Sequence, residues 1–170
     1  MITSFIQEFA DKKLALVASG QISMSLAYRA IKDYTNGMRA SVVEKYSPSL
    51  ITDIEEAISS ILDEKDELPP KTDIDVFYEK FSDVYDKFSE IMIYSKIKSG
   101  LSDKLMHHSF SEIAFMELGE RNYEEALSNI NAYADGMSKL FFEFGHKDNY
   151  FVVEEMREEI KNNVEKLYKQ

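Results

Sequence analysis

The sequence lacks cysteine and tryptophan and has few residues that break helices. Of its 170 residues none is cysteine, six are glycine and three are proline. The absence of cysteine excludes disulfide bonds, thiolate metal ligands and a cysteine nucleophile, and it fits a reducing compartment. Purely apolar runs, such as 140–142, span only a few residues and are far shorter than the roughly 20 residues that cross a membrane. The first residues lack the basic start and apolar stretch of a signal peptide, so we expect a cytoplasmic protein without membrane contact.

Positive charge is also scarce. Lys and Arg number 20 against 31 Asp and Glu, which gives a formal net charge of −11. Nucleic acids and anionic lipids are bound by Lys and Arg that neutralise phosphates, so we expect neither as a direct partner. Hydrophobic residues make up 44% of the chain and charged residues 30%, which is the composition of a folded protein.

The apolar residues recur at helical spacing, and Gly and Pro stand where helices should end. No alternating apolar and polar stretch is long enough to predict a strand. We therefore expect a single all-α domain over residues 1–170, with about seven antiparallel helices. The expected helices cover residues 4–18, 22–46, 48–64, 73–98, 102–118, 122–144 and 149–168.

The segment 73–98 has the most regular apolar pattern. Its apolar residues follow the spacing 3, 4, 3, 4, 3 and form a heptad seam: Ile74, Phe77, Phe81, Val84, Phe88 and Ile91. Tyr78, Tyr85 and Met92 flank this seam. Such a stripe favours the central helix of a bundle core. The alternative is a surface for a partner helix or for a second copy of the chain, with Tyr78, Tyr85 and Met92 as contact residues.

The chain is similar to itself at an offset of 99 residues. Residues 12–68 align without a gap to residues 111–167, with twelve identical pairs in 57 positions. We interpret the two segments as internally duplicated helical-hairpin units bridged by 73–98. Gly20 and Gly119 fall in the turns, where a left-handed backbone is often required. Gly37 and Gly136 fall within helices, where a glycine often marks a close helix crossing or a kink.

A stretch of about 25 residues carries large and small apolar residues in a recurring order: Phe110, Ile113, Ala114, Tyr123, Ala126 and Ile130. With these residues the stretch resembles a tetratricopeptide (TPR) repeat. A weaker copy comprises Leu14, Ala15, Ala27 and Ile31. Glu117 and Tyr133 depart from the pattern, and the offset of 99 differs from the 34-residue TPR period. The resemblance implies a helical-hairpin scaffold that binds proteins, packed as a short solenoid or a bundle.

Few residues in the sequence are candidates for a catalytic or metal site. His107 and His108 point about 100° apart on a helix, whereas His108 and Glu112 share a face and have the spacing of two ligands. No further ligand is indicated. Glu143 and His146 have the Glu-x-x-His spacing of di-iron bundles, but the motif occurs once and such sites need it twice. Phosphate-binding loops and nucleophile elbows are absent from the sequence. We therefore expect neither an enzyme nor a cofactor.

Acidic residues gather in the segment 149–168. Glu154, Glu155, Glu158 and Glu159 place like charges four residues apart. An ordinary solvated helix face explains this pattern, but an acidic patch also attracts basic partners. The sequence thus favours a non-enzymatic protein-interaction module or adaptor. The alternatives are an acidic inhibitor that mimics nucleic acid and binds a basic protein, and a bundle that holds a metal or small ligand.

Overall fold

The computed structural model describes residues 1–97 and 99–169, and it confirms the all-α class. These residues form seven α-helices and two short 3₁₀ helices and contain no strand. The helices pack into a bundle, and within the described residues none is long and apolar enough to cross a membrane. The elements are α1 (Ile2–Ala18), α2 (Met24–Lys45), α3 (Ser49–Ile61), η1 (Glu64–Asp66), α4 (Ile74–Ile91), η2 (Ile93–Lys96), α5 (Gly100–Glu117), α6 (Tyr123–Glu143) and α7 (Lys147–Tyr168).

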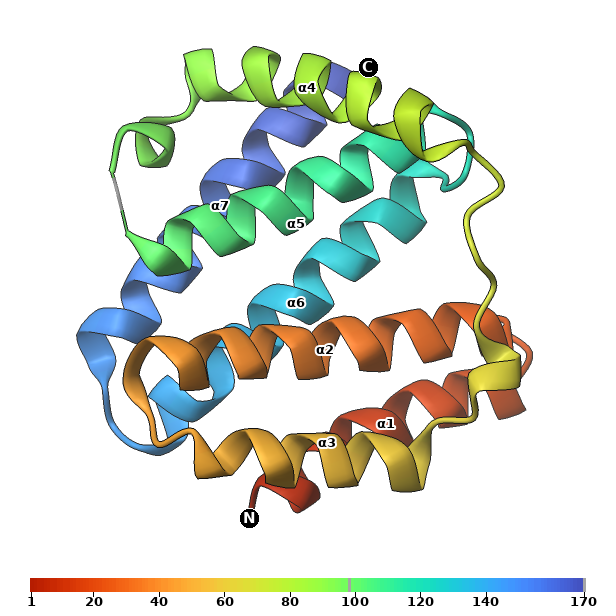
Figure 1. Cartoon of the computed structure of the whole chain (residues 1–170), viewed down its shortest axis with the longest axis vertical. Coiled ribbons are helices and arrows are strands. Elements are labelled where there is room, and N and C mark those ends of the chain that lie inside the picture. Colours follow the sequence, from red (N-terminus) through yellow and green to blue (C-terminus); the bar gives the residue numbers. More distant parts are fainter. Residues whose placement is uncertain (98, 170) are drawn as a thin grey trace.

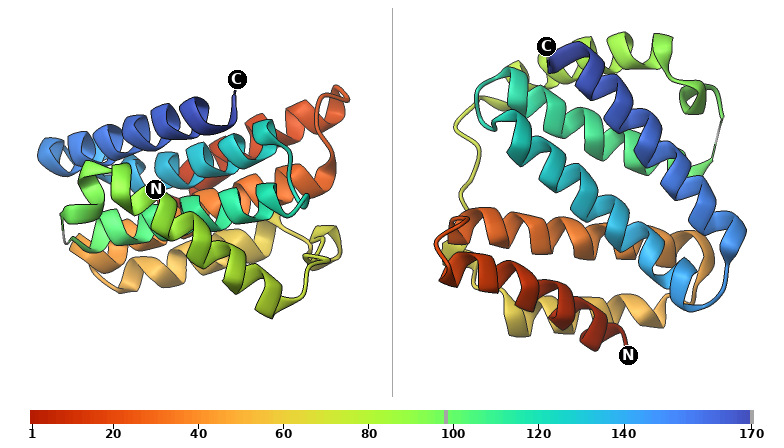
Figure 2. Two further views of the ribbon diagram at one scale, coloured as in Figure 1. Left: turned by 90° about the horizontal axis from the view of Figure 1, so that it is seen from above. Right: turned by 180° about the vertical axis from the view of Figure 1, so that it is seen from behind.

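Helices α2 and α6 cross at the centre of the molecule (Figure 1). Helices α1 and α3 lie beside α2 at the end that holds the N-terminus, and α5 and α7 lie beside α6. Helix α4 crosses the opposite end, near the C-terminus, after a linker that runs along one edge (Figure 2). The chain therefore forms two three-helix groups, α1–α3 and α5–α7, joined by the linker and α4.

The turn after the first helix of each group has the same geometry, at positions 99 residues apart. Gly20 and Gly119 have φ angles of +78° and +80°, as the sequence predicts. The next helices are capped alike, because Ser23 accepts a hydrogen bond from the N–H of Leu26 and Asn122 accepts one from Glu125. The local sequence thus sets the same entry into α2 and α6.

The crossing of α2 and α6 brings two backbones into contact. A Cβ atom built on Gly37 would lie 1.9 Å from the carbonyl oxygen of Tyr133, and one built on Gly136 would lie 1.8 Å from that of Tyr34. Only glycine allows this approach. The prediction of a close crossing at the two mid-helix glycines is confirmed.

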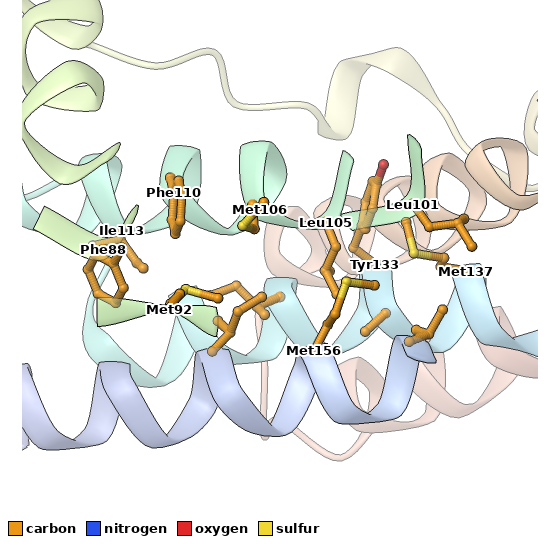
Figure 3. Packing of buried hydrophobic residues seen from close by; sticks show 14 of the residues in the cluster. Phe88, Met92, Leu101, Leu105, Met106, Phe110, Ile113, Tyr133, Met137 and Met156 are labelled. Atoms are coloured by element: carbon orange, nitrogen blue, oxygen red, sulfur yellow. The ribbon is translucent and has the colours of Figure 1, made fainter. Parts of the chain in front are cut away.

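The buried apolar side chains form two clusters on the two sides of this crossing. The larger lies among α4, α5, α6 and α7 and includes Phe88, Phe110 and Met156 (Figure 3). The smaller lies among α1, α2 and α3, and it is completed by Leu140 from α6. Tyr133 is buried in the larger cluster and Tyr34 in the smaller.

Helix α4 is peripheral, so the prediction of a central helix over 73–98 is wrong. Among its apolar seam only Val84 and Phe88 are buried, while Ile74 and Ile91 are exposed. The helix also ends earlier than predicted, because the chain turns into an extended conformation at Met92. The hydroxyl of Ser95 donates to carbonyl oxygens at this end and stabilises the break.

Candidate functional site

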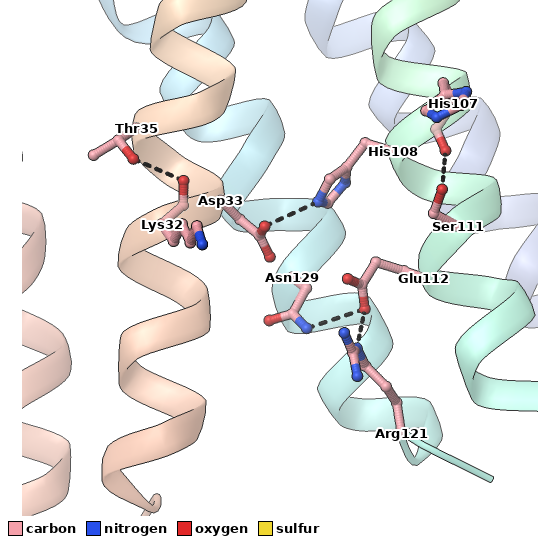
Figure 4. A network of polar contacts seen from close by, with 9 residues as sticks. All are labelled: Lys32, Asp33, Thr35, His107, His108, Ser111, Glu112, Arg121 and Asn129. Carbon is pink, nitrogen blue, oxygen red and sulfur yellow. Dashed lines mark hydrogen bonds and ion pairs between the residues drawn. The ribbon is translucent and has the colours of Figure 1, made fainter. Parts of the chain in front are cut away.

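A buried polar cluster lies where α2, α5 and α6 meet. Asp33 from α2 and His108 and Glu112 from α5 point toward one another (Figure 4). The Nε2 atom of His108 lies 3.2 Å from Oδ1 of Asp33. Asp33 and Glu112 are only 9% and 5% exposed. Two carboxyl groups in such a place need partners, because an unpaired buried charge is costly.

Glu112 obtains its partners from the turn before α6 and from α6 itself. Its Oε2 atom accepts hydrogen bonds from Nε of Arg121 at 2.6 Å and from Nδ2 of Asn129 at 3.0 Å. Burial raises the pKa of Glu112, while the charge of Arg121 acts in the opposite direction. The guanidinium of Arg121 is itself buried, so this ion pair joins α5 to the α5–α6 turn in a region of weak solvent screening.

Three buried atoms of the cluster have no hydrogen-bond partner among the described residues. They are Oδ2 of Asp33, Nδ1 of His108 and Oδ1 of Asn129. The ring of His108 is held by Tyr133, which stacks on it with ring centres 4.2 Å apart. The cluster is therefore fixed in place but incompletely satisfied, which is unusual for buried polar groups.

A pocket of about 220 Å³ opens beside the cluster. Asp33 and Glu112 line it together with Arg29, Lys32 and Arg121. Burial, and then the charge of Arg121, lower the pKa of Arg29. Lys32 lies 2.9 Å from Glu67, which comes from the 3₁₀ region after α3. Acidic and basic side chains thus share the same wall.

Part of this cluster could be predicted from the sequence. His107 and His108 diverge as expected, since His107 is exposed and packs on Phe81 while His108 faces α2. His108 and Glu112 share a face, also as expected. The sequence analysis missed Asp33, because no local pattern relates it to residues on α5. The residues of the other candidate pair have separate partners, since Glu143 accepts a hydrogen bond from Lys139 and His146 bonds to Tyr46.

The outer side of α4 offers a second candidate surface. Tyr78 is 58% exposed and Tyr85 is 47% exposed, so both are available to a partner, as the alternative interpretation of this helix requires. Met92 is only 1% exposed, because it turns into the core where α4 ends. Its prediction as a contact residue is wrong.

Carboxylates also follow the outer side of α4 at spacings of three and four residues. They therefore share one helix face, next to the flank that carries Tyr78 and Tyr85. All five are exposed, and within residues 1–97 and 99–169 none of them lies in an ion pair. We call this surface the acidic stripe: Asp75, Glu79, Asp83, Asp86 and Glu90.

The predicted acidic patch on α7 is largely engaged inside the molecule. Glu154 lies 3.2 Å from Arg157, which also binds Asp135. Glu155 accepts a hydrogen bond from the hydroxyl of Tyr94. Glu159 accepts one from the backbone N–H of Ile93, so both residues hold η2 against α7. Glu158 is exposed. The four residues do not form one free acidic face.

Comparison of the chain with protein-family models, with curated proteins and with solved structures found no match.

Proposed function

We propose that the protein is a non-enzymatic interaction module that binds a basic segment of another protein on the outer side of α4. The observation that carries the proposal is the position of Tyr78 and Tyr85, exposed beside the acidic stripe on a helix that is anchored by Val84 and Phe88. Exposed tyrosines are typical anchors of protein interfaces.

Charge identifies the kind of partner. Carboxylates three and four residues apart repel one another, and Lys or Arg side chains of a partner relieve this repulsion. The same cations gain from the faces of Tyr78 and Tyr85 through cation–π contacts. A second copy of this chain would bring two acidic stripes together, so charge disfavours a homodimer through this surface.

The proposal keeps one element of the acidic-inhibitor hypothesis, the basic partner, but moves the contact from α7 to α4. Glu158 remains the residue of the α7 group best placed for an external contact. The proposal also includes the origin of the scaffold in two duplicated TPR-like hairpin units. The matching turns and the reciprocal glycine contacts at an offset of 99 residues support that origin.

Affinity capture with matched variants tests the proposal. The wild-type chain, a Tyr78→Ala/Tyr85→Ala variant and a Glu79→Lys/Asp83→Lys variant are compared as baits. We expect a stoichiometric basic partner on the wild-type chain that both variants lose. Its binding should weaken as salt rises, because the contact depends on exposed charges.

The control bait is Glu158→Lys, which changes the same charge on α7. Capture that survives in this variant and fails in both α4 variants supports the α4 surface. Equal capture by all baits, or loss only with Glu158→Lys, contradicts it. Thermal unfolding of each bait checks that its fold is intact, and light scattering of the pure chain reveals any homodimer.

A further inference from the structure

The cluster of Asp33, His108 and Glu112 has the groups of a metal site. Each side chain offers one ligand atom, and the three atoms lie within 4.8 Å of one another. Three ligands around one ion, each about 2.0–2.2 Å from it, lie at comparable mutual distances. Figure 4 shows that these ligands come from two helices, with Asp33 on α2 facing the other two on α5.

The buried polar atoms without a hydrogen-bond partner indicate which kind of ligand the cluster can bind. Oδ2 of Asp33 and Oδ1 of Asn129 are buried acceptors without a donor. At these two oxygen atoms an anion would add only further acceptors. A cation satisfies acceptors directly, so the cluster fits a cation.

Glu112 is held as metal-binding carboxylates commonly are. Arg121 and Asn129 both bind its Oε2 atom, which fixes the carboxylate and leaves Oε1 for another partner. The contact of His108 with Asp33 likewise orients the imidazole before any ion arrives. Hydrogen bonds thus fix the carboxylate of Glu112 and the ring of His108 in place, and Glu112 keeps one carboxylate oxygen for an ion.

The donor set and the nearby charges limit the metal. One imidazole and two carboxylates suit Zn²⁺ and Mn²⁺, whereas Cu⁺ prefers sulfur. The positive charges of Arg29 and Arg121 oppose any cation. This penalty excludes ions that bond weakly to nitrogen, such as Mg²⁺ and Ca²⁺, and favours Zn²⁺ over Mn²⁺.

We propose that Asp33, His108 and Glu112 bind one divalent transition-metal ion, which ties α2 to α5 beside the pocket at Arg29. The site is independent of the α4 surface. It goes beyond the proposed interaction function, and either can fail without the other.

Titration of the chelator-treated chain tests the site. The chain is purified without a metal-affinity column, and Zn²⁺ and Mn²⁺ are added separately while calorimetry records the binding and the unfolding temperature is measured. We expect one ion per chain, tighter binding of Zn²⁺ than of Mn²⁺, no binding of Mg²⁺, and a higher unfolding temperature with Zn²⁺. His108→Ala and Asp33→Asn should each weaken binding at least tenfold.

His107→Ala is the matched control, because His107 is the adjacent histidine but is exposed. It should bind Zn²⁺ as the wild-type chain does. Circular dichroism confirms that each variant is folded, and Asp33→Asn keeps the shape of the side chain if His108→Ala unfolds. A wild-type chain that takes up neither ion overturns the proposal, and so does binding that depends on His107 instead of His108.

Discussion

The two halves of the bundle share their backbone contacts but differ in side-chain chemistry. At positions 99 residues apart, Phe9 stacks on Tyr34 with ring centres 4.1 Å apart, and His108 stacks on Tyr133 at 4.2 Å. The same slot therefore holds an apolar ring in one half and an imidazole in the other.

The residues around the two slots differ in the same sense. Asp33, which faces His108, corresponds to Ala132 in the other half, and Glu112 corresponds to Lys13. Turns and crossings restrict backbone geometry, and few residue types meet those restrictions. The slot restricts only the size and flatness of a ring. The comparison teaches that this scaffold can carry a polar cluster on one side while it keeps the same glycine turns and the same central crossing.

The largest loss of stability is expected from substitution of the crossing glycines, which the two halves share. Gly37→Ala and Gly136→Ala each place a methyl group against a carbonyl oxygen of the facing helix, where the backbone must move. We expect each to cost more than about 3 kcal/mol of unfolding free energy. Urea titration measures the loss. Gly20→Ala is the control, since its space is open and only its positive φ is strained, at about 1 kcal/mol. Unequal losses at Gly37 and Gly136 would break the equivalence.

The next largest loss of stability is expected only in the half that contains Glu112. Glu112→Gln leaves the guanidinium of Arg121, whose side chain is 7% exposed, buried without its counter-charge. We expect a loss of about 3 kcal/mol. Lys13→Gln at the equivalent position should change the free energy of unfolding by less than about 0.5 kcal/mol. Similar losses at both positions, measured by urea unfolding, would contradict the assigned role of the cluster.

A smaller effect tests whether one slot can be converted into the other. His108→Phe keeps a stacked ring but leaves the carboxylate of Asp33 buried without its donor, at a cost of about 2 kcal/mol. Adding Asp33→Ala, which copies Ala132, should recover most of that loss. A double-mutant cycle measures the coupling. Additive losses would show that the two slots are not interchangeable.

The smallest effect appears in alkaline solution. Burial raises the pKa of Tyr133 to about 12, and it also raises the pKa of Tyr34. A raised pKa favours the neutral phenol in the folded state. The stability is therefore complete below about pH 10 and falls as the pH rises to about 12. We expect Tyr133 to cost roughly 1 kcal/mol at pH 11. Unfolding of Tyr133→Phe at pH 9 and pH 11 should show a smaller decrease than the wild-type chain. An equal decrease would contradict this account.

The helices, their glycine turns and the crossing could be predicted from the sequence. Helices and turns depend on residues close together in the chain, and the crossing depends on glycines within helices. The sequence did not predict how little of α4 is buried. A heptad seam indicates which face is apolar, but Ile74 and Ile91 show that such a face can extend beyond the core. The partner of His108 could not be predicted either, because Asp33 lies on another helix and the packing of α2 against α5 brings the two residues together.

That crossing also dictates when the protein can fold during synthesis. The N-terminal apolar cluster needs Leu140, and the carbonyl of Tyr34 meets Gly136. A growing chain that has produced α1, α2 and α3 therefore still lacks the helix that closes their core. Contacts so distant in sequence form late and slow the search for the native state. The nascent N-terminal half must remain soluble, with its apolar face uncovered, until most of the polypeptide has left the ribosome.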